Sequence, residues 1–243
     1  MENLCSVKQR RNKQDVYWDI RQKIITLELA PGTSLDEAEL VQRYGVSRTP
    51  IRETLIRLHG EGLVDLRENR GAYVTQLDLP ALQAYFEAAD FIHSAVVRLA
   101  AVRRTAADLE NIEREMLAFE RAMSKEDMGT MVAHNNGFHE AIGLAARNDY
   151  LYAGYRRLLA DHERISQLCY RHELETGDEA TKRITLDQHR GVYDAIRNRA
   201  AVEAAEIALA HLNLCKTGLT EILTGSSELL DGIEMEKVGS FSP

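Results

Sequence analysis

Residues 31–74 have the sequence PGTSLDEAELVQRYGVSRTPIRETLIRLHGEGLVDLRENRGAYV, in which turn, capping and apolar residues alternate in an order that predicts two helices and then a β-hairpin. Ser34 and Glu37 have the spacing of a capping box, in which each side chain bonds a free backbone N–H group at a helix start. A helix is therefore expected over residues 36–44, and Gly45 is expected to end it in the left-handed conformation.

The next helix is expected to begin at Ser47, because serine is a frequent N-cap and Pro50 is tolerated in a first helical turn. It carries an apolar stripe and is expected to end at Gly60 and Gly62. Residues 63–74 then alternate apolar and polar side chains around a polar turn that contains glycine. This alternation predicts a β-hairpin.

A helix upstream completes the predicted N-terminal fold, since residues 15–29 place isoleucine and leucine at helical spacing before Pro31 and Gly32. Three helices and a hairpin form a winged helix-turn-helix, whose third helix enters the major groove of DNA. Arginine binds guanine O6 and N7, a helix N-terminus suits phosphate, and a hairpin tip can carry arginine to a minor groove. The candidate DNA-binding residues on these two elements are Ser47, Arg48, Thr49, Arg52, Arg67, Asn69, Arg70 and Gly71.

Three motifs within this stretch, VSRTPIRE, RLxxEGLV and RxNRGAxV, resemble the winged-helix domain of the GntR family of bacterial transcription regulators over about 60 residues. The resemblance implies that the third helix reads an operator and that the hairpin, or wing, contributes further contacts. The residues it implicates are Arg48, Thr49 and Arg52 on the helix and Arg67, Arg70 and Gly71 on the wing, with Arg43 as a candidate for contact with the DNA backbone.

From Pro80 onward the chain is rich in alanine, leucine and glutamate at helical spacing, without strand patterns. About six helices are expected, near residues 80–103, 105–123, 127–146, 149–171, 179–198 and 201–223. The predicted fold is thus mainly α. Its predicted domains are a winged helix-turn-helix over residues 1–78, an all-helical bundle for ligand binding and dimerisation over 79–225, and a flexible tail over 226–243.

Three of the eight histidines occupy suggestive positions in the helical part. His139 follows Asn135 by one helical turn, so both project from the same face. His189 and His211 lie 22 positions apart on consecutive helices that a short turn would make antiparallel, so they can face each other. Imidazole nitrogen binds borderline divalent metals well. The alternative is that each histidine is an ordinary core or surface residue.

The motifs FHxAI followed by N-x-x-L, QHRxxYDAI and AxxHL make residues 80–223 resemble the all-helical FCD effector domain of the FadR subfamily. In metal-binding members, three histidines and an aspartate one turn before the first of them coordinate a divalent ion. The resemblance therefore implies a metal site formed by Asn135, His139, His189 and His211, which would hold Zn, Ni or Mn.

Three positions depart from that family pattern. Asn135 stands where the family has aspartate, and an amide oxygen brings no charge, so weaker metal binding is expected. The first effector helix has Ala89 and His93 where the family often has arginine and glutamate. Loss of the arginine removes a clamp for a carboxylate effector, which leaves His93 as a candidate residue of the effector pocket.

The charge is distributed unevenly over the chain, whose net charge is −8. Residues 1–78 hold 12 Lys and Arg and 12 Asp and Glu, so the whole deficit lies beyond them and a basic face on an acidic body is possible. No segment reaches the roughly 20 apolar residues of a membrane span. Cys5, Cys169 and Cys215 form no CxxC pair. A cytoplasmic protein without membrane partners is expected.

These patterns predict a ligand-responsive regulator that represses a metabolic operon and binds a palindromic operator as a homodimer, because two-fold proteins read two half-sites. Its expected partners are double-stranded operator DNA and a small-molecule effector, with a carboxylate as the candidate class. It is not expected to be an enzyme. The alternatives are a metal-dependent hydrolase using the three-histidine site, which lacks a general base at fixed spacing, and a purely architectural DNA-binding protein.

Overall fold

The computed structural model describes residues 13–68 and 70–225. The chain forms two compact units whose boundary lies between Gln76 and Leu77, close to the boundary predicted after residue 78. The tail predicted over residues 226–243 lies outside the described residues.

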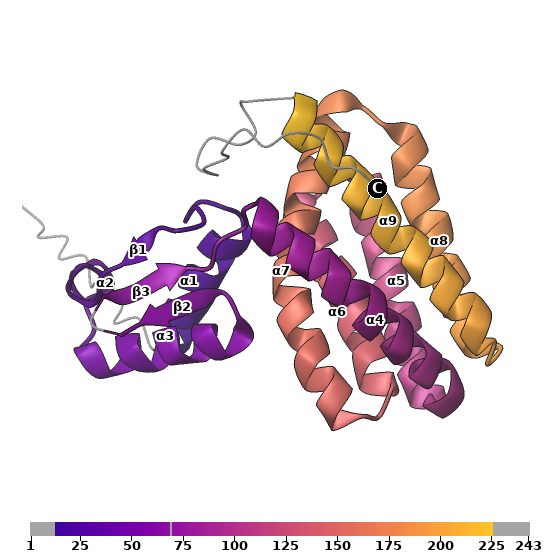
Figure 1. The fold of residues 1–243 in the computed structure, drawn as a ribbon, viewed down its shortest axis with the longest axis horizontal. Helices are drawn as coiled ribbons and strands as arrows, with labels where there is room; N and C mark the ends of the chain where they lie inside the picture. The colour runs from indigo at the N-terminus through magenta and orange to yellow at the C-terminus, as the bar shows by residue number, and fades with distance from the viewer. Residues whose placement is uncertain (1–12, 69, 226–243) are drawn as a thin grey trace, which may run out of the picture. The chain divides into compact units, whose positions relative to one another are not determined.

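The first unit contains three helices and a small antiparallel sheet (Figure 1). In the sheet the strand over Ser34–Leu35 and the strand over Val64–Arg67 both pair with the strand over Gly71–Val74, and the hairpin pairs from Val64 opposite Val74 to Arg67 opposite Gly71. The winged helix-turn-helix predicted from the sequence is confirmed. The elements are α1 (Lys13–Ile25), β1 (Ser34–Leu35), α2 (Glu37–Tyr44), α3 (Arg48–Glu61), β2 (Val64–Arg67) and β3 (Gly71–Val74).

The capping box predicted at Ser34 is wrong. Ser34 lies in β1, where its backbone is paired with Tyr73 of β3, and Asp36 is the residue that caps α2. The Asp36 carboxylate accepts hydrogen bonds from the backbone N–H groups of Ala38 and Glu39 at 2.8 and 2.9 Å. A two-residue strand is too short to produce an alternating pattern, so the sequence does not reveal it.

Local signals set the other boundaries of this unit. Helix α1 ends at Ile25, four residues before the predicted end, and Leu27 follows in the left-handed conformation with φ of 63°. Gly62, with φ of 87°, ends α3 and directs the chain into the hairpin. Apolar side chains of α1 and α3, including Ile20 and Ile51, are fully buried and form the core of this unit.

The second unit is a bundle of six helices among the described residues, as predicted. Five of them begin at a side chain that accepts a hydrogen bond from the first helical turn, which fixes their starting points. The helices are α4 (Leu79–Arg103), α5 (Ala106–Ser124), α6 (Met128–Ala145), α7 (Asp149–Thr176), α8 (Glu179–Arg197) and α9 (Ala201–Gly225). The caps are Asp78, Thr105, Asp127, Asn148 and Asp178.

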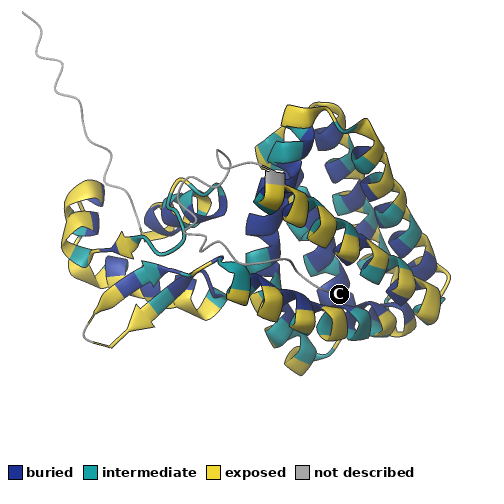
Figure 2. Ribbon diagram, turned by 45° about the horizontal axis from the view of Figure 1, so that its top comes forward, coloured by how far each residue is buried: buried dark blue, intermediate teal, exposed yellow. Residues whose placement is uncertain are grey.

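The bundle helices turn their buried residues inward, and Figure 2 shows the exposed residues on their outer sides. Helix α5 packs along α6, α4 along α9, α8 along α9 and α6 along α7. Helices α6 and α7 approach closely at Gly143, where a Cβ atom would lie 2.8 Å from the Tyr155 ring. No helix in the described part of the chain is both long and apolar enough to cross a membrane.

Candidate DNA interface and histidine cluster

The N-terminus of α3 is open on its outer side. Ser47 occupies the N-cap position but makes no side-chain capping hydrogen bond, and the first turn of α3 holds no acidic residue. By contrast, α2 is capped by Asp36 and carries Glu37 in its first turn. Helix N-termini bind phosphate through free N–H groups and the helix dipole. The start of α3 is therefore suited to a DNA phosphate, whereas that of α2 is already neutralised.

The arginines predicted to contact DNA are exposed on this unit. Arg52 forms an ion pair within the protein, since its Nε atom lies 2.9 and 2.8 Å from the two carboxylate oxygens of Glu37. Because only Nε is bonded, the two Nη groups can still contact a base, and Glu37 would hold the guanidinium in place. The exposed predicted residues of α2 and α3 are Arg43, Ser47, Arg48, Thr49 and Arg52.

The wing presents its arginines at the end of the hairpin. The Arg67 guanidinium lies 4.4 Å from the centre of the Tyr73 ring, and the Arg70 backbone N–H donates to the Arg67 carbonyl at 3.0 Å. Gly71 has φ of 88°, a conformation that other residues adopt only with strain, and this allows the tight turn. Asn69 lies outside the described residues. The DNA-contact roles of the helix and wing residues stay predictions.

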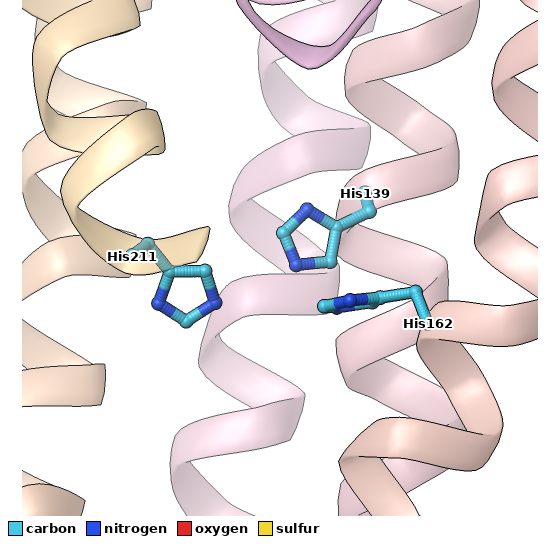
Figure 3. Close-up of side chains that lie close together, drawn as sticks. All are labelled: His139, His162 and His211. Carbon is cyan, nitrogen blue, oxygen red and sulfur yellow. The ribbon is translucent and has the colours of Figure 1, made fainter. Parts of the chain in front are cut away.

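Buried histidines from different helices of the bundle converge in its interior. His139 on α6, His162 on α7 and His211 on α9 each offer a ring nitrogen, and these nitrogens all lie within 4.8 Å of one another (Figure 3). His189 on α8 joins them, because its Nε2 lies 3.3 Å from Nε2 of His211. We call His139, His162, His189 and His211 the histidine cluster.

His162 was not predicted from the sequence. It begins a run of polar residues on α7 that the apolar pattern would assign to solvent but that the bundle buries. No motif marks this run, and its burial depends on α7 crossing the centre of the bundle. The buried polar residues of the run are His162, Glu163, Arg164, Ser166 and Gln167.

Neighbouring side chains identify which nitrogens of two cluster histidines are unprotonated. Nδ1 of His211 lies 3.0 Å from Oε1 of Gln188, an acceptor, so Nδ1 carries the proton and Nε2 has the free electron pair. The Asn135 amide nitrogen donates to Nε2 of His162 at 3.2 Å, so Nδ1 of His162 carries the proton and donates to the Tyr85 hydroxyl at 3.2 Å. Such outer partners commonly orient metal-binding histidines.

The cluster is held in its neutral form. Burial away from water lowers the pKa of His162 and His211 to about 3, with neighbouring histidines adding to the effect. The pKa values of His139 and His189 are also well below the usual range, mainly through burial. Metal binding requires neutral imidazole. The cluster is therefore ready to bind an ion without first losing protons at neutral pH.

Unsatisfied atoms show that the cluster fits a divalent metal. Among the described residues, both ring nitrogens of His139, Nδ1 of His189 and Oδ1 of Asn135 are buried without a hydrogen-bond partner. Leaving such a group unpaired costs about 1 to 3 kcal/mol. The 3.3 Å between the Nε2 atoms of His189 and His211 also matches the spacing of about 3 Å expected for two nitrogens about 2.1 Å from one ion.

His93 lies at the edge of this cluster. Its buried ring meets the His139 ring edge to face, with centroids 5.4 Å apart, and burial lowers its pKa to about 4. A separate cavity of about 110 Å³ lies between α7, α8 and α9, with His211 in its wall, but His93 is not among its lining residues. The lining includes Glu173, Asp178 and Glu221 and contains no lysine or arginine.

The fold and the open α3 N-terminus define the class of this protein as a winged-helix DNA-binding protein with a helical sensor-like bundle. Residues 12–74 match the family of bacterial regulatory proteins named gntR, and residues 84–214 match the FCD domain. The chain belongs to the GntR family of transcription regulators, in the branch that carries an FCD domain.

Known proteins agree with this assignment. The chain is 24% identical to the HTH-type transcriptional repressor RspR of Escherichia coli over 88% of this chain and 92% of that protein. It is 28% identical to the galactonate operon transcriptional repressor of Escherichia coli over 87% of this chain and 98% of that protein. The solved structure of McbR/YncC from E. coli has the same fold, with a TM-score of 0.67 and 19% identity over 86% of this chain and 95% of that one.

The chain is therefore a DNA-binding transcription regulator and not an enzyme, since its family consists of regulators. Nothing in these comparisons supports the alternative of a metal-dependent hydrolase. The histidine cluster has to be understood as part of a regulator's helical domain.

Proposed function

We propose that this regulator is a cytoplasmic, ligand-responsive repressor of a metabolic operon, which binds a palindromic operator as a homodimer and holds a divalent metal in its helical domain. The observation that carries the proposal is a buried cluster of neutral histidines inside a bundle attached to a DNA-reading unit. A protein that only bound DNA would not need such a cluster. Relatives include repressors, one of them of the galactonate operon.

In this proposal α3 reads base edges and the wing supports it. The exposed arginines and the uncapped α3 N-terminus support these roles. Glu37 acts as a positioning residue for Arg52. The proposed contact residues are Arg43, Ser47, Arg48, Thr49, Arg52, Arg67, Asn69, Arg70 and Gly71.

The proposed metal is Zn, Ni or Mn, bound by His139, His189 and His211, with Asn135 as an oxygen donor or as a residue that orients a ligand. When bound, the ion would offer an electron-poor centre to an oxygen atom of the effector. The cavity beside His211 is the proposed effector site. Because its lining contains no lysine or arginine, a carboxylate effector would depend on the ion for charge neutralisation.

The effector proposal predicts that ligand binding depends on the metal. In a thermal-shift screen of small carboxylates and sugar acids, at least one compound should raise the Tm of metal-loaded protein, because a ligand that binds the native state stabilises it. The same compound should have little effect after treatment with a chelator. An equal increase in Tm with and without metal would refute a metal-dependent effector site.

The dimer proposal predicts that the full chain sediments as a dimer at micromolar concentration and binds one operator duplex per dimer. Its support, besides operator symmetry, is that Phe91 and Tyr150 on the bundle are 80% and 95% exposed, which leaves large apolar side chains for an interface. Sedimentation equilibrium at several concentrations, with and without operator DNA, measures both quantities. A monomer at micromolar concentration would contradict the proposal.

A further inference from the structure

The histidine cluster contains one histidine more than the family pattern supplies. The sequence resemblance accounts for His139, His189 and His211 and places a carboxylate at position 135, where this chain has an amide. His162 comes from a different helix, α7, yet its ring centre lies 4.7 Å from that of His139. This chain therefore has an amide in place of the carboxylate and an additional buried histidine next to His139.

Asn135 is directly connected to this additional histidine. Its amide nitrogen donates to Nε2 of His162 at 3.2 Å and to the Ser166 hydroxyl at 3.1 Å. An aspartate at this position could not donate either bond, and its charge would instead favour a protonated His162. Asparagine thus holds the His162 ring with an unprotonated Nε2 next to the cluster.

The other nitrogen of the His162 ring, Nδ1, also has a hydrogen-bond partner. The Nδ1–H group donates to the buried Tyr85 hydroxyl, which sets the tautomer that leaves Nε2 free of a proton. Exchange of the hydrogen bond from Asn135 for a bond to an ion needs no proton transfer at this ring. The ring nitrogens of His139, His162 and His211 already lie within 4.8 Å of one another.

We propose that His162 is a metal ligand in this protein and takes the place of the family's aspartate, so that the ion is held by the four histidines of the cluster. This inference rests on the proposed metal site. Asn135 is then a positioning residue for His162 and not a ligand itself.

The all-imidazole site has consequences for the metal and for what binds to it. Imidazole ligands suit Zn, Ni and Co, whereas Mn prefers sites with carboxylate oxygen. Four neutral imidazoles also leave the two positive charges of the ion uncompensated inside the bundle. An anionic oxygen ligand would compensate part of that charge, which favours a carboxylate effector even though the cavity has no cationic side chain.

The test is a titration of metal-free full-length protein with Co(II), Zn and Mn, in which visible absorption reports the Co(II) ligands and chelator competition gives the affinities. His162→Ala and the larger His162→Gln are each expected to weaken Co(II) and Zn binding 10-fold or more and to change the Co(II) spectrum. His134→Ala, on α6 but outside the cluster, where its Nδ1 lies 2.8 Å from a carboxylate oxygen of Glu115, should behave as the wild type. Far-UV circular dichroism checks that the variants are folded.

The Asn135→Asp substitution tests whether a carboxylate can replace His162 as a ligand. Introduced into His162→Ala, it should restore Co(II) and Zn binding at least in part and raise Mn affinity, because a carboxylate then occupies the vacated position. If both His162 variants keep wild-type affinity and an unchanged Co(II) spectrum while His189→Ala loses binding, His162 is not a ligand. The metal site at the other histidines would then stand. A wild-type protein that takes up none of these metals would overturn the metal site itself.

Discussion

Replacement of Arg48 with alanine is expected to weaken binding to the operator by about 1 to 3 kcal/mol, or about 5- to 150-fold, through loss of a bidentate contact to a base. Within the described residues Arg48 has no ion pair, and its side chain is exposed next to the uncapped start of α3. Arg52→Ala is expected to have a loss of similar size.

The measurement is titration of labelled operator DNA, selected in vitro, against a scrambled duplex at two salt concentrations. Arg57→Ala is the matched control, because it removes the same charge from the same helix but its guanidinium lies 3.5 Å from the Tyr17 ring centre. Binding by the wild type should fall steeply with salt as arginines displace counterions. Wild-type operator affinity in both Arg48→Ala and Arg52→Ala would show that α3 does not read the operator.

A Glu37 variant tests, in the same titration, whether Glu37 positions the Arg52 side chain for its contact with DNA. The exposed Arg52–Glu37 pair contributes at most about 1 kcal/mol to stability, so Glu37→Ala should leave the fold intact. It removes a negative charge near DNA, which favours binding to any sequence, but it also frees the Arg52 guanidinium. The ratio of operator to scrambled-duplex affinity should therefore fall while non-specific affinity rises.

Elements whose boundaries depend on neighbouring residues can be predicted from the sequence, whereas features that depend on packing between helices cannot. The bundle helices were predicted to within a few residues because caps such as Thr105 and Asn148 lie at the breaks themselves. Helix α7 is the exception: it continues to Thr176, where Gly177 ends it, beyond the predicted end at 171. No glycine or proline stands between residue 171 and Gly177, so the sequence was compatible with a helix up to Gly177 and the predicted end was too early.

The histidine cluster could likewise be predicted only in part from local sequence patterns. His189 and His211 could be paired from sequence because one short turn connects their helices. In the structure their Nε2 atoms lie 3.3 Å apart. His162 could not be added, since its approach to His139 depends on the packing of α6 against α7, which includes the close contact at Gly143. Helices α6 and α7 are also consecutive, but His162 lies in a polar run that nothing in the sequence marks as buried, so no local pattern pairs it with His139.

The cavity beside the histidine cluster contains a carboxyl group that makes the stability of the bundle depend on pH. Glu173 is 8% exposed, and its Oε2 atom has no hydrogen-bond partner among the described residues. Burial raises the pKa of this carboxyl from 4.5 to about 7, with Asp178 adding to the effect and Lys182 opposing it. The folded protein therefore favours the protonated carboxyl. Its stabilising contribution is complete below pH 4.5 and is lost as the pH rises through about 7.

Glu173→Gln is accordingly expected to stabilise the protein at high pH, since the neutral amide carries no charge to bury. The free energy of unfolding of the variant should match that of the wild type near pH 4.5 and exceed it by about 3 kcal/mol at pH 8, because each pKa unit corresponds to about 1.4 kcal/mol. Urea unfolding followed by circular dichroism between pH 4.5 and 8 measures the difference, in which all other titrating groups cancel. Glu175→Gln, an exposed change on the same helix, should give a curve parallel to that of the wild type. A Glu173→Gln curve that is also parallel to the wild type would show that this carboxyl is charged and solvated in the folded protein at neutral pH.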